Sequence, residues 1–432
     1  MLMLFEPPPG APADFAARLA ERLRQSTSAA PPYNRRLVRR RGLHYWVDDD
    51  DFDLAHHFVH TSLPKPGRIR ELLAMVSRVH GGHLDRAYPL WRLYLIEGIE
   101  DGRIALYMKV HHSLMDGITG VRMLMDMMAP TPEESLKLPP PWEVVRKKSE
   151  SQPLPVPTPG LGGVSALRAL ARDGVRSVTP LLRELAGSFK DFRKKRPELA
   201  LAGQAPRIVF NQKVSATRRF AAQSYATPRL RKVAQAFDAS LNDVVLAMVS
   251  GALRRYLADL GELPEDPLIT AVAVSTRREN SDKANEVGFT MVGLATDLED
   301  PVARLQAIRD GMSYNKRVLK TLSPGQYMAH SALLMMPGAA SVLLGLSPKK
   351  ALANLVVSHV PGPRVPMYWQ GAKLTGVYPA SLIVDSGALN ITLISRHDFV
   401  DFGLVACRKS VPHMQRLLDH LESALAELEA LA

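Results

Sequence analysis

Cysteine is nearly absent from this chain: Cys407 is the only one among 432 residues. One cysteine can form neither an internal disulfide nor a metal site with several cysteine ligands, and such usage is typical of a reducing compartment. Cys407 lies in an apolar strand pattern with no histidine near it in the sequence, whereas a reactive thiolate needs an accessible, electropositive setting. We therefore expect a core cysteine and a cytoplasmic protein.

Long apolar runs are missing as well. The longest, ALLMMPGAASVLLGL at residues 332–346, is shorter than a bilayer span and is interrupted by Pro337. It predicts a buried helix pair, with an interfacial segment as the alternative. The N-terminal stretch MLMLFEPPPG has no basic leader, so it does not resemble a signal peptide. We expect a chain that is soluble or attached peripherally to a membrane.

Several catalytic signatures are also absent. The sequence has no G-x-x-x-x-G-K-[ST], G-x-S-x-G or H-E-x-x-H pattern, and no G-x-G-x-x-G after a strand. Their absence argues against P-loop nucleotide hydrolysis, α/β-hydrolase chemistry and zinc proteolysis. No zinc-finger spacing or aromatic RNA-binding signature occurs either, so we expect no nucleic-acid partner.

Positive charge, in contrast, is abundant and unevenly placed. The formal net charge is +12, and residues 142–200 carry 12 Lys and Arg against 6 Asp and Glu. A second cluster is RRLVRRR at residues 35–41. Such clusters bind nucleic acid, anionic lipid or phosphorylated ligands, and a solvated basic face is an equally good interpretation of either cluster alone.

Helical and strand patterns alternate in the first part of the chain. Residues 12–25 and 68–82 have helical patterns, and the strand patterns WRLYLIEGI and RIALYMKV flank an Asp101-Gly102 hairpin turn. The second part adds the strand RRFAAQSYA, a helix with Thr227 as N-cap, a long helix after SLND, three strands, a hairpin and a terminal amphipathic helix. This mixture predicts two α/β layered domains.

Prolines and basic residues separate the two parts. We predict an N-terminal domain at residues 1–140, a Pro-rich and basic amphipathic linker at 141–205, and a C-terminal domain at 206–432. The cationic helix pattern of the linker is a candidate membrane-surface element, and packing against the protein itself is the alternative.

The stretch KVHHSLMDGITG is the strongest candidate for a working site. His111 and His112 stand where a strand pattern ends, and Asp116 and Gly117 precede a helical pattern. Loops held by a rigid strand often carry catalytic groups. Adjacent strand residues point to opposite faces, so the two histidines and Asp116 are poorly arranged to bind one ion, and we expect no metal. A second doublet, His56-His57, has no following glycine and is expected to be structural.

The stretch KVHHSLMDGITGVRM resembles the H-H-x-x-x-D-G motif of the bacterial wax ester synthase/diacylglycerol acyltransferase family. This family belongs to the CoA-dependent acyltransferases, which share an H-x-x-x-D core. Further matches follow in the family's order along almost the whole chain: YPLW, SLNDVVLA, AVSTR, VSHVPGP, and YPASLIVDSGALNITLIS leading into FGLVACR.

The resemblance implies two chloramphenicol-acetyltransferase-like domains, each a mixed sheet with helices, and a tunnel at their interface. It implies an O-acyltransferase that moves a long-chain fatty acyl group from acyl-CoA to a fatty alcohol or diacylglycerol, with no cofactor besides this substrate. Peripheral association with a membrane or lipid inclusions is expected, and a homodimer stays open. The alternative is a catalytically weak homologue that binds a lipid surface or droplet.

The resemblance also implies roles for the motif residues. His112 would be the general base, because an alcohol hydroxyl is a weak acid whose proton must leave as it attacks a thioester, and imidazole titrates near neutral pH. Asp116 would hold the loop that aims His112, Gly117 would allow the tight turn, and His111 would shape the loop.

Asn242 matches the family residue with a supporting role at the negatively charged tetrahedral intermediate. For Asn242 and Asp243, ordinary capping of a helix is an equal alternative.

Three departures from the family pattern stand out. The chain begins at MLMLF, inside the family's first strand, His359 replaces the usual asparagine, and Arg396 with His397 stands where a tyrosine is usual. The resemblance implies that such changes affect activity or acceptor choice.

Overall fold

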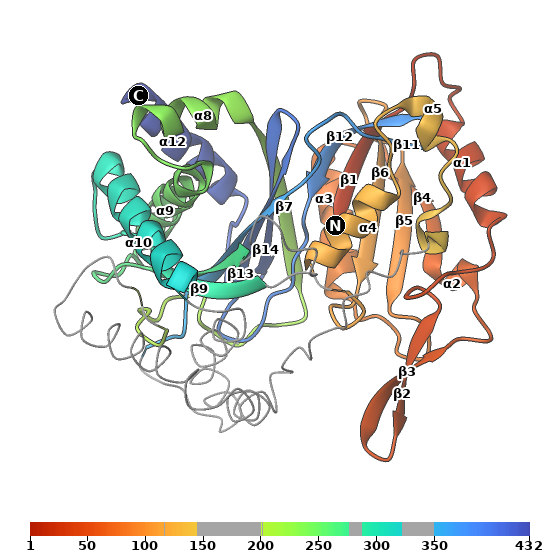
Figure 1. Cartoon of the computed structure of the whole chain (residues 1–432), viewed down its shortest axis with the longest axis horizontal. Coiled ribbons are helices and arrows are strands. Elements are labelled where there is room, and N and C mark those ends of the chain that lie inside the picture. The colour runs from red at the N-terminus through yellow and green to blue at the C-terminus, as the bar shows by residue number, and fades with distance from the viewer. Residues whose placement is uncertain (116, 145–199, 201, 276–286, 322–349) are drawn as a thin grey trace.

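The computed structural model describes residues 1–432 except for 116, 145–199, 201, 276–286 and 322–349. Two six-stranded sheets lie side by side, each covered by helices (Figure 1). The predicted mixed α/β architecture with two sheet-containing domains is therefore confirmed. Most of the predicted linker and the apolar run at residues 332–346 lie outside the described residues.

The first sheet has the strand order β11-β12-β1-β6-β5-β4. Its strands are β1 (Leu2–Glu6), β4 (Phe58–Ser62), β5 (Trp91–Glu97), β6 (Ile104–Val110), β11 (Tyr368–Trp369) and β12 (Ala372–Tyr378). The helices that accompany it are α1 (Phe15–Arg24), α2 (Leu54–His57), α3 (Ile69–Gly81), α4 (Gly117–Asp126) and α5 (Pro132–Ser135), with a 3₁₀ turn at Pro141–Glu143. All pairs in this sheet are antiparallel except β4 with β5.

Strand β6 is buried from both sides, because alternate residues point to opposite faces. Ile104 and Leu106 belong to an apolar cluster with buried residues of α1 and α4. Ala105 and Tyr107 belong to another cluster, which includes α3 and extends into the second sheet through Phe220. The core is thus continuous between the two sheets.

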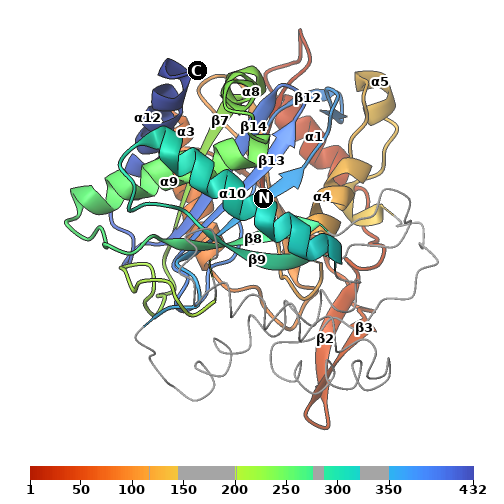
Figure 2. The ribbon, with the colours of Figure 1, turned by 60° about the vertical axis from the view of Figure 1, so that its left-hand side comes forward.

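The second sheet has the order β7-β14-β13-β10-β8-β9. Its strands are β7 (Arg218–Ala226), β8 (Ile269–Ser275), β9 (Val287–Gly293), β10 (Leu355–Pro361), β13 (Leu389–Arg396) and β14 (Phe399–Cys407). Its helices are α8 (Thr227–Ala236), α9 (Leu241–Asp259), α10 (Pro301–Thr321) and α12 (Arg416–Ala430). The long α9, which is mostly buried, lies beside α10 and α12, as Figure 2 shows from a second direction.

The C-terminal part of the chain adds strands to the first sheet. Strand β12, from the C-terminal part, pairs with β1 from Leu2 opposite Tyr378 to Glu6 opposite Lys373. The predicted C-terminal domain at residues 206–432 therefore contributes β11 and β12 to the sheet of the predicted N-terminal domain. Just after β12, Pro379 lies directly against β14: a Cβ at Gly403 would collide with the Pro379 carbonyl oxygen.

Most predicted elements are confirmed, with one correction at a helix start. Helices α1 and α3, the β5–β6 hairpin with Gly102 at φ +79°, and the β13–β14 hairpin lie where their patterns indicate. Thr227 is not the N-cap of α8: Ala226 is, and the Thr227 hydroxyl makes no cap bond. The Thr227 amide donates instead to the Asp398 carbonyl at 2.7 Å, so a tertiary contact replaces the local cap.

Two residues expected to be structural are buried. Cys407 is 0% exposed within β14. His57 is also 0% exposed, and its ring stacks at 4.4 Å on Trp91 and at 5.1 Å on Phe52. Burial lowers the pKa of His57 to about 4, so the ring is neutral near pH 7. The structural interpretation of the His56-His57 doublet is confirmed.

Within the described residues, no single helix is long and apolar enough to span a bilayer. Helices α8 and α9 taken together have the required length and apolar composition, but the chain bends by 98° between them.

Candidate functional site

The candidate site is built on the end of β6, which lies between β1 and β5 in the first sheet. The last ladder pair joins Val110 to Trp91. The His111 amide then donates to the Leu90 carbonyl at 2.9 Å, and the Leu114 amide donates to the His111 carbonyl at 2.9 Å. These bonds make a tight turn with His112 inside it, and α4 begins at Gly117. The predicted strand–turn–helix setting of the motif is confirmed.

His111 is held by its own turn. Its Nδ1 accepts from the Ser113 amide at 3.2 Å and lies 2.7 Å from the Ser113 hydroxyl. Because an amide can only donate, Nδ1 is the unprotonated nitrogen of this ring. Burial, Arg86 and His112 together lower the pKa of His111. His111 is therefore a neutral ring tied to the turn, which agrees with a loop-shaping role.

His112 is exposed at the same turn. Among the residues that the structure describes, no side chain or backbone group makes a hydrogen bond to its ring. Both ring nitrogens of His112 are thus open to a bound molecule, whereas the Nδ1 of His111, which is also exposed, is engaged by Ser113. Asp116, predicted to hold the loop, lies outside the described residues, and for Gly117 only the backbone, as the first residue of α4, is described.

A buried polar cluster lies along the same strand. His80 on α3 accepts at Nδ1 from the Tyr107 hydroxyl at 2.9 Å and donates from Nε2 to the Ser381 carbonyl at 3.3 Å. Burial is the main cause that lowers the pKa of His80 to about 4. Lys109 donates to the carbonyls of Val79, at 2.8 Å, and Gly82 at the C-terminal end of α3, where a cation is favoured.

This cluster was missed by the sequence analysis, although polar residues in an apolar strand pattern are the signal that points to it. Burial also lowers the pKa of Lys109 to about 8. The cluster connects β6, α3 and the loop after β12, so it holds the strand that presents His112 against the C-terminal part of the chain.

Asn242 and Asp243 separate into two environments at the start of α9. Ser240 is the N-cap, and it forms a reciprocal capping box with Asp243: the Ser240 amide donates to Asp243 Oδ2 at 2.8 Å, and the Asp243 amide donates to Ser240 Oγ at 3.3 Å. The capping interpretation therefore holds for Asp243. Asn242 is half-buried and takes no part in the cap. No hydrogen bond in the described part of the chain joins it to His112.

Two of the departures from the family pattern, at His359 and Arg396, make defined contacts in the structure. His359 Nε2 lies 2.6 Å from the Ser395 hydroxyl between neighbouring strands, and burial lowers the pKa of this histidine. Arg396 forms a buried ion pair, with its Nε 2.5 Å from Asp401 Oδ2 and side-chain exposures of 11% and 0%. Burial raises the pKa of Asp401, and Arg396 opposes that effect.

The Arg396–Asp401 pair ties the two sheets together. Arg396 donates to the Thr375 carbonyl of β12, and Asp401 accepts from the Val377 amide at 2.8 Å and from the Ser224 hydroxyl at 2.6 Å. An acidic residue inside an apolar strand was the available signal for Asp401. In the described parts of the chain, no group of three or more His, Cys, Asp or Glu side chains is arranged to bind a metal ion.

Comparisons with known proteins agree along the whole chain. Residues 1–245 match the model of the wax ester synthase/diacylglycerol acyltransferase catalytic domain, and residues 283–429 match the WS/DGAT C-terminal domain. An O-acyltransferase WSD from Acinetobacter baylyi is 41% identical over 430 residues, covering 99% of this chain and 92% of the relative.

Solved structures give the same result. A wax ester synthase/diacylglycerol acyltransferase from Marinobacter aquaeolei VT8 aligns at a TM-score of 0.81 and 41% identity, covering 100% of this chain and 93% of the other. The first condensation domain of the calcium-dependent antibiotic synthetase aligns at 0.59 with 16% identity, covering 100% and 89%, and shows a shared fold alone. The predicted fold class is confirmed by both.

Proposed function

Because the chain belongs to the wax ester synthase/diacylglycerol acyltransferase family, we propose that it is an O-acyltransferase that moves a long-chain fatty acyl group from acyl-CoA to a fatty alcohol or a diacylglycerol. The observation that carries the proposal is His112, exposed and without a hydrogen-bond partner among the described residues, at a strand end inside the family's H-H-x-x-x-D-G motif. The Nδ1 of its neighbour His111 accepts a hydrogen bond from the Ser113 amide and lies near the Ser113 hydroxyl, so the two rings are not interchangeable.

The reaction follows from the chemistry of an imidazole. His112 takes the proton of the acceptor hydroxyl while the oxygen attacks the thioester carbonyl. The tetrahedral intermediate then collapses, the carbon–sulfur bond breaks, and the leaving CoA sulfur receives the proton. No acyl-enzyme forms. General-base assistance of this kind contributes roughly 100- to 10,000-fold to the rate.

Supporting roles follow the same scheme. Asp116 would position the loop that carries His112, and Asn242, which is not used by the helix cap, would donate to the oxyanion. Acyl-CoA and acceptor would meet in a tunnel between the two sheets. The protein would associate peripherally with a membrane or lipid inclusion in the cytoplasm, where acceptors that are insoluble in water gather. The reaction needs no resident cofactor.

Thiol release from palmitoyl-CoA, with and without hexadecanol, tests the proposal. We expect acceptor-dependent release by the unaltered protein and a loss of roughly 100-fold or more in His112→Ala. His111→Ala is the matched control, with a smaller loss, and circular dichroism checks that both variants fold. Near-normal turnover by His112→Ala would contradict the assignment.

The same assay addresses the alternative and the acceptor. Lipid binding without acceptor-dependent release by the unaltered protein would favour a weakly catalytic lipid-surface homologue. Parallel rates with hexadecanol and a diacylglycerol identify the preferred acceptor.

A further inference from the structure

A two-stranded hairpin projects from the first domain, away from both six-stranded sheets (Figure 1). It consists of β2 (Arg35–Arg40) and β3 (Leu43–Asp48), paired from Arg35 opposite Asp48 to Arg40 opposite Leu43. An isolated two-stranded hairpin is marginally stable in water, so its apolar side chains gain from contact with another surface.

The hairpin exposes large apolar side chains on both faces. Leu43 is 63% exposed, Tyr45 46% and Trp46 37%. The register places Leu37 opposite Trp46 and Val38 opposite Tyr45, so each face carries an aromatic ring beside an aliphatic residue. Tyrosine and tryptophan combine an apolar ring with a polar tip, and both are enriched where a membrane meets water.

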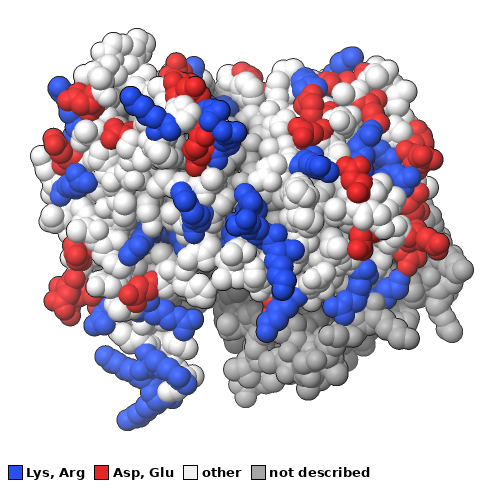
Figure 3. All heavy atoms as spheres, turned by 180° about the vertical axis from the view of Figure 1, so that it is seen from behind, with Lys and Arg blue, Asp and Glu red and all other residues white. Residues whose placement is uncertain are grey.

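Charge is distributed along the length of the hairpin. At its base the arginines are paired: Arg35 Nε lies 3.3 Å from Asp48, and Arg36 Nε lies 3.3 Å from Asp49. Toward the tip, residues 39–41 are three exposed arginines without an ion pair to any described residue. Figure 3 shows the hairpin from behind as a projecting, positively charged finger at the edge of the molecule.

We propose that the β2–β3 hairpin anchors the protein to an anionic lipid surface, with its arginines at the headgroups and Leu43, Tyr45 and Trp46 in the interface. Nucleic acid would satisfy the arginines but leave Leu43 exposed to water, whereas a lipid surface satisfies both. Each arginine near such a surface strengthens binding about fivefold. The use of the anchor rests on the proposed function, since it brings the enzyme to acceptors dissolved in lipid.

The tryptophans of the chain provide a direct probe. Of the four, Trp46 is exposed, and Trp91, Trp142 and Trp369 are at most 1% exposed. With phosphatidylcholine vesicles containing phosphatidylglycerol, we expect a blue shift of the Trp46 emission and quenching by lipids brominated near the headgroup. Both signals should disappear in Trp46→Phe and weaken with rising salt. Emission that does not change on addition of the anionic vesicles would overturn the proposal.

Charge reversal tests the arginines. In a flotation assay, Arg39→Glu/Arg40→Glu should bind these vesicles at least tenfold more weakly, while the matched pair Arg231→Glu/Lys232→Glu on α8 should bind almost as the unaltered protein does. Equal binding by the hairpin variant, or tight DNA binding without vesicle binding, would overturn the proposal.

A failure of the proposed acyltransferase function can be told apart from a failure of the hairpin anchor. Thiol release with detergent-dispersed hexadecanol should be unchanged in the hairpin variant. If the unaltered protein binds vesicles through the hairpin but releases no thiol with any acceptor, the anchor stands and the acyltransferase proposal does not.

Discussion

Adjacent residues of this chain differ in role because their local bonds differ. His111 is occupied by the backbone and hydroxyl of Ser113, whereas His112, one residue further into the turn, makes no hydrogen bond to the described residues. Asp243 is committed to a capping box, and Asn242 beside it is not. In both pairs, the residue whose side chain is not engaged in local hydrogen bonds, His112 or Asn242, is the one proposed to act on the substrate.

At the start of α9, we expect substitution of Asp243 to affect stability and substitution of Asn242 to affect catalysis. Asp243→Ala removes half of the capping box and should lower the free energy of unfolding by about 1 kcal/mol while kcat stays near normal. Asn242→Ala should leave thermal unfolding unchanged and lower kcat by roughly 100-fold, since an oxyanion donor acts only in the transition state. Calorimetry and thiol-release kinetics on both variants measure the two effects.

Ser240→Ala is the control for the cap and should resemble Asp243→Ala. A full kcat in Asn242→Ala would remove Asn242 from the proposed site.

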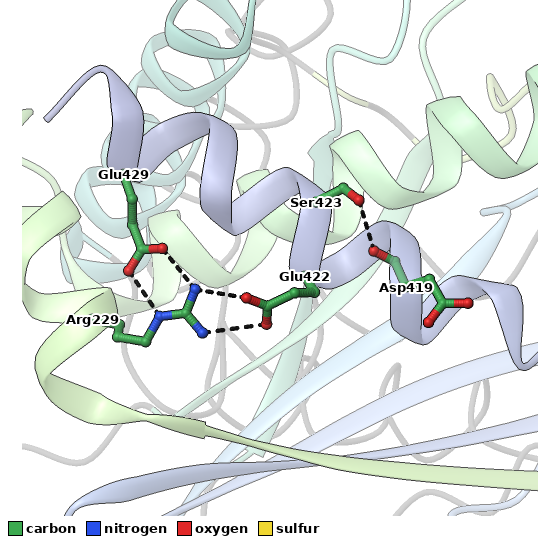
Figure 4. A network of polar contacts seen from close by, with 5 residues as sticks. All are labelled: Arg229, Asp419, Glu422, Ser423 and Glu429. Atoms are coloured by element: carbon green, nitrogen blue, oxygen red, sulfur yellow. Dashed lines mark hydrogen bonds and ion pairs between the residues drawn. The ribbon is translucent and has the colours of Figure 1, made fainter.

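Among the arginine networks that join elements of this fold, one between α8 and α12 and one at Arg396 differ in burial. Figure 4 shows Arg229 of α8 between Glu422 and Glu429 of α12, at 2.7 and 2.6 Å. Hydrogen bonds to Glu429 and Glu422 raise the pKa of Arg229, but the three side chains are 23–42% exposed. The Arg396–Asp401 pair, in contrast, is almost fully buried and also bonds β12.

Burial should decide the energetic effect of the two networks. Asp401→Ala leaves the Arg396 guanidinium buried without its partner and should cost about 3–5 kcal/mol of unfolding free energy. Arg229→Ala should cost about 1 kcal/mol or less, because water screens exposed ion pairs. Urea denaturation of both variants gives the comparison.

The double variant Arg396→Met/Asp401→Leu should recover much of the loss, since no buried charge is left unpaired. A cost below 1 kcal/mol for Asp401→Ala would show that the pair does not hold the sheets together.

At the scale of the whole molecule, strand β12, which the C-terminal part adds to the first sheet, makes the two halves interdependent. Leu2 to Phe5 of strand β1 are at most 3% exposed. Without β12, β1 would be an open edge of the first sheet and these apolar residues would lose part of their cover. The apolar cluster that contains Tyr107 also continues into the second sheet.

A fragment of residues 1–144 should therefore fail to fold alone. We expect no cooperative thermal transition by circular dichroism and rapid proteolysis, whereas the full chain should lose both sheets in one transition. Addition of residues 206–432 in trans is the control, since it supplies β11 and β12. A cooperative transition of the fragment by itself would contradict this dependence.

The sequence by itself determined most of the helices and strands, the turn at Gly102, the start of a helix at SLND and the order of the family motifs, because these depend on residues close in the chain. It also placed His112 at the end of a strand. The tertiary structure alone decided that β12 joins the first sheet, that Arg396 pairs with Asp401, and that β2–β3 stays exposed. The physical reason is that a strand's own sequence sets its pattern of faces, while its partner is chosen by the packing of the whole chain.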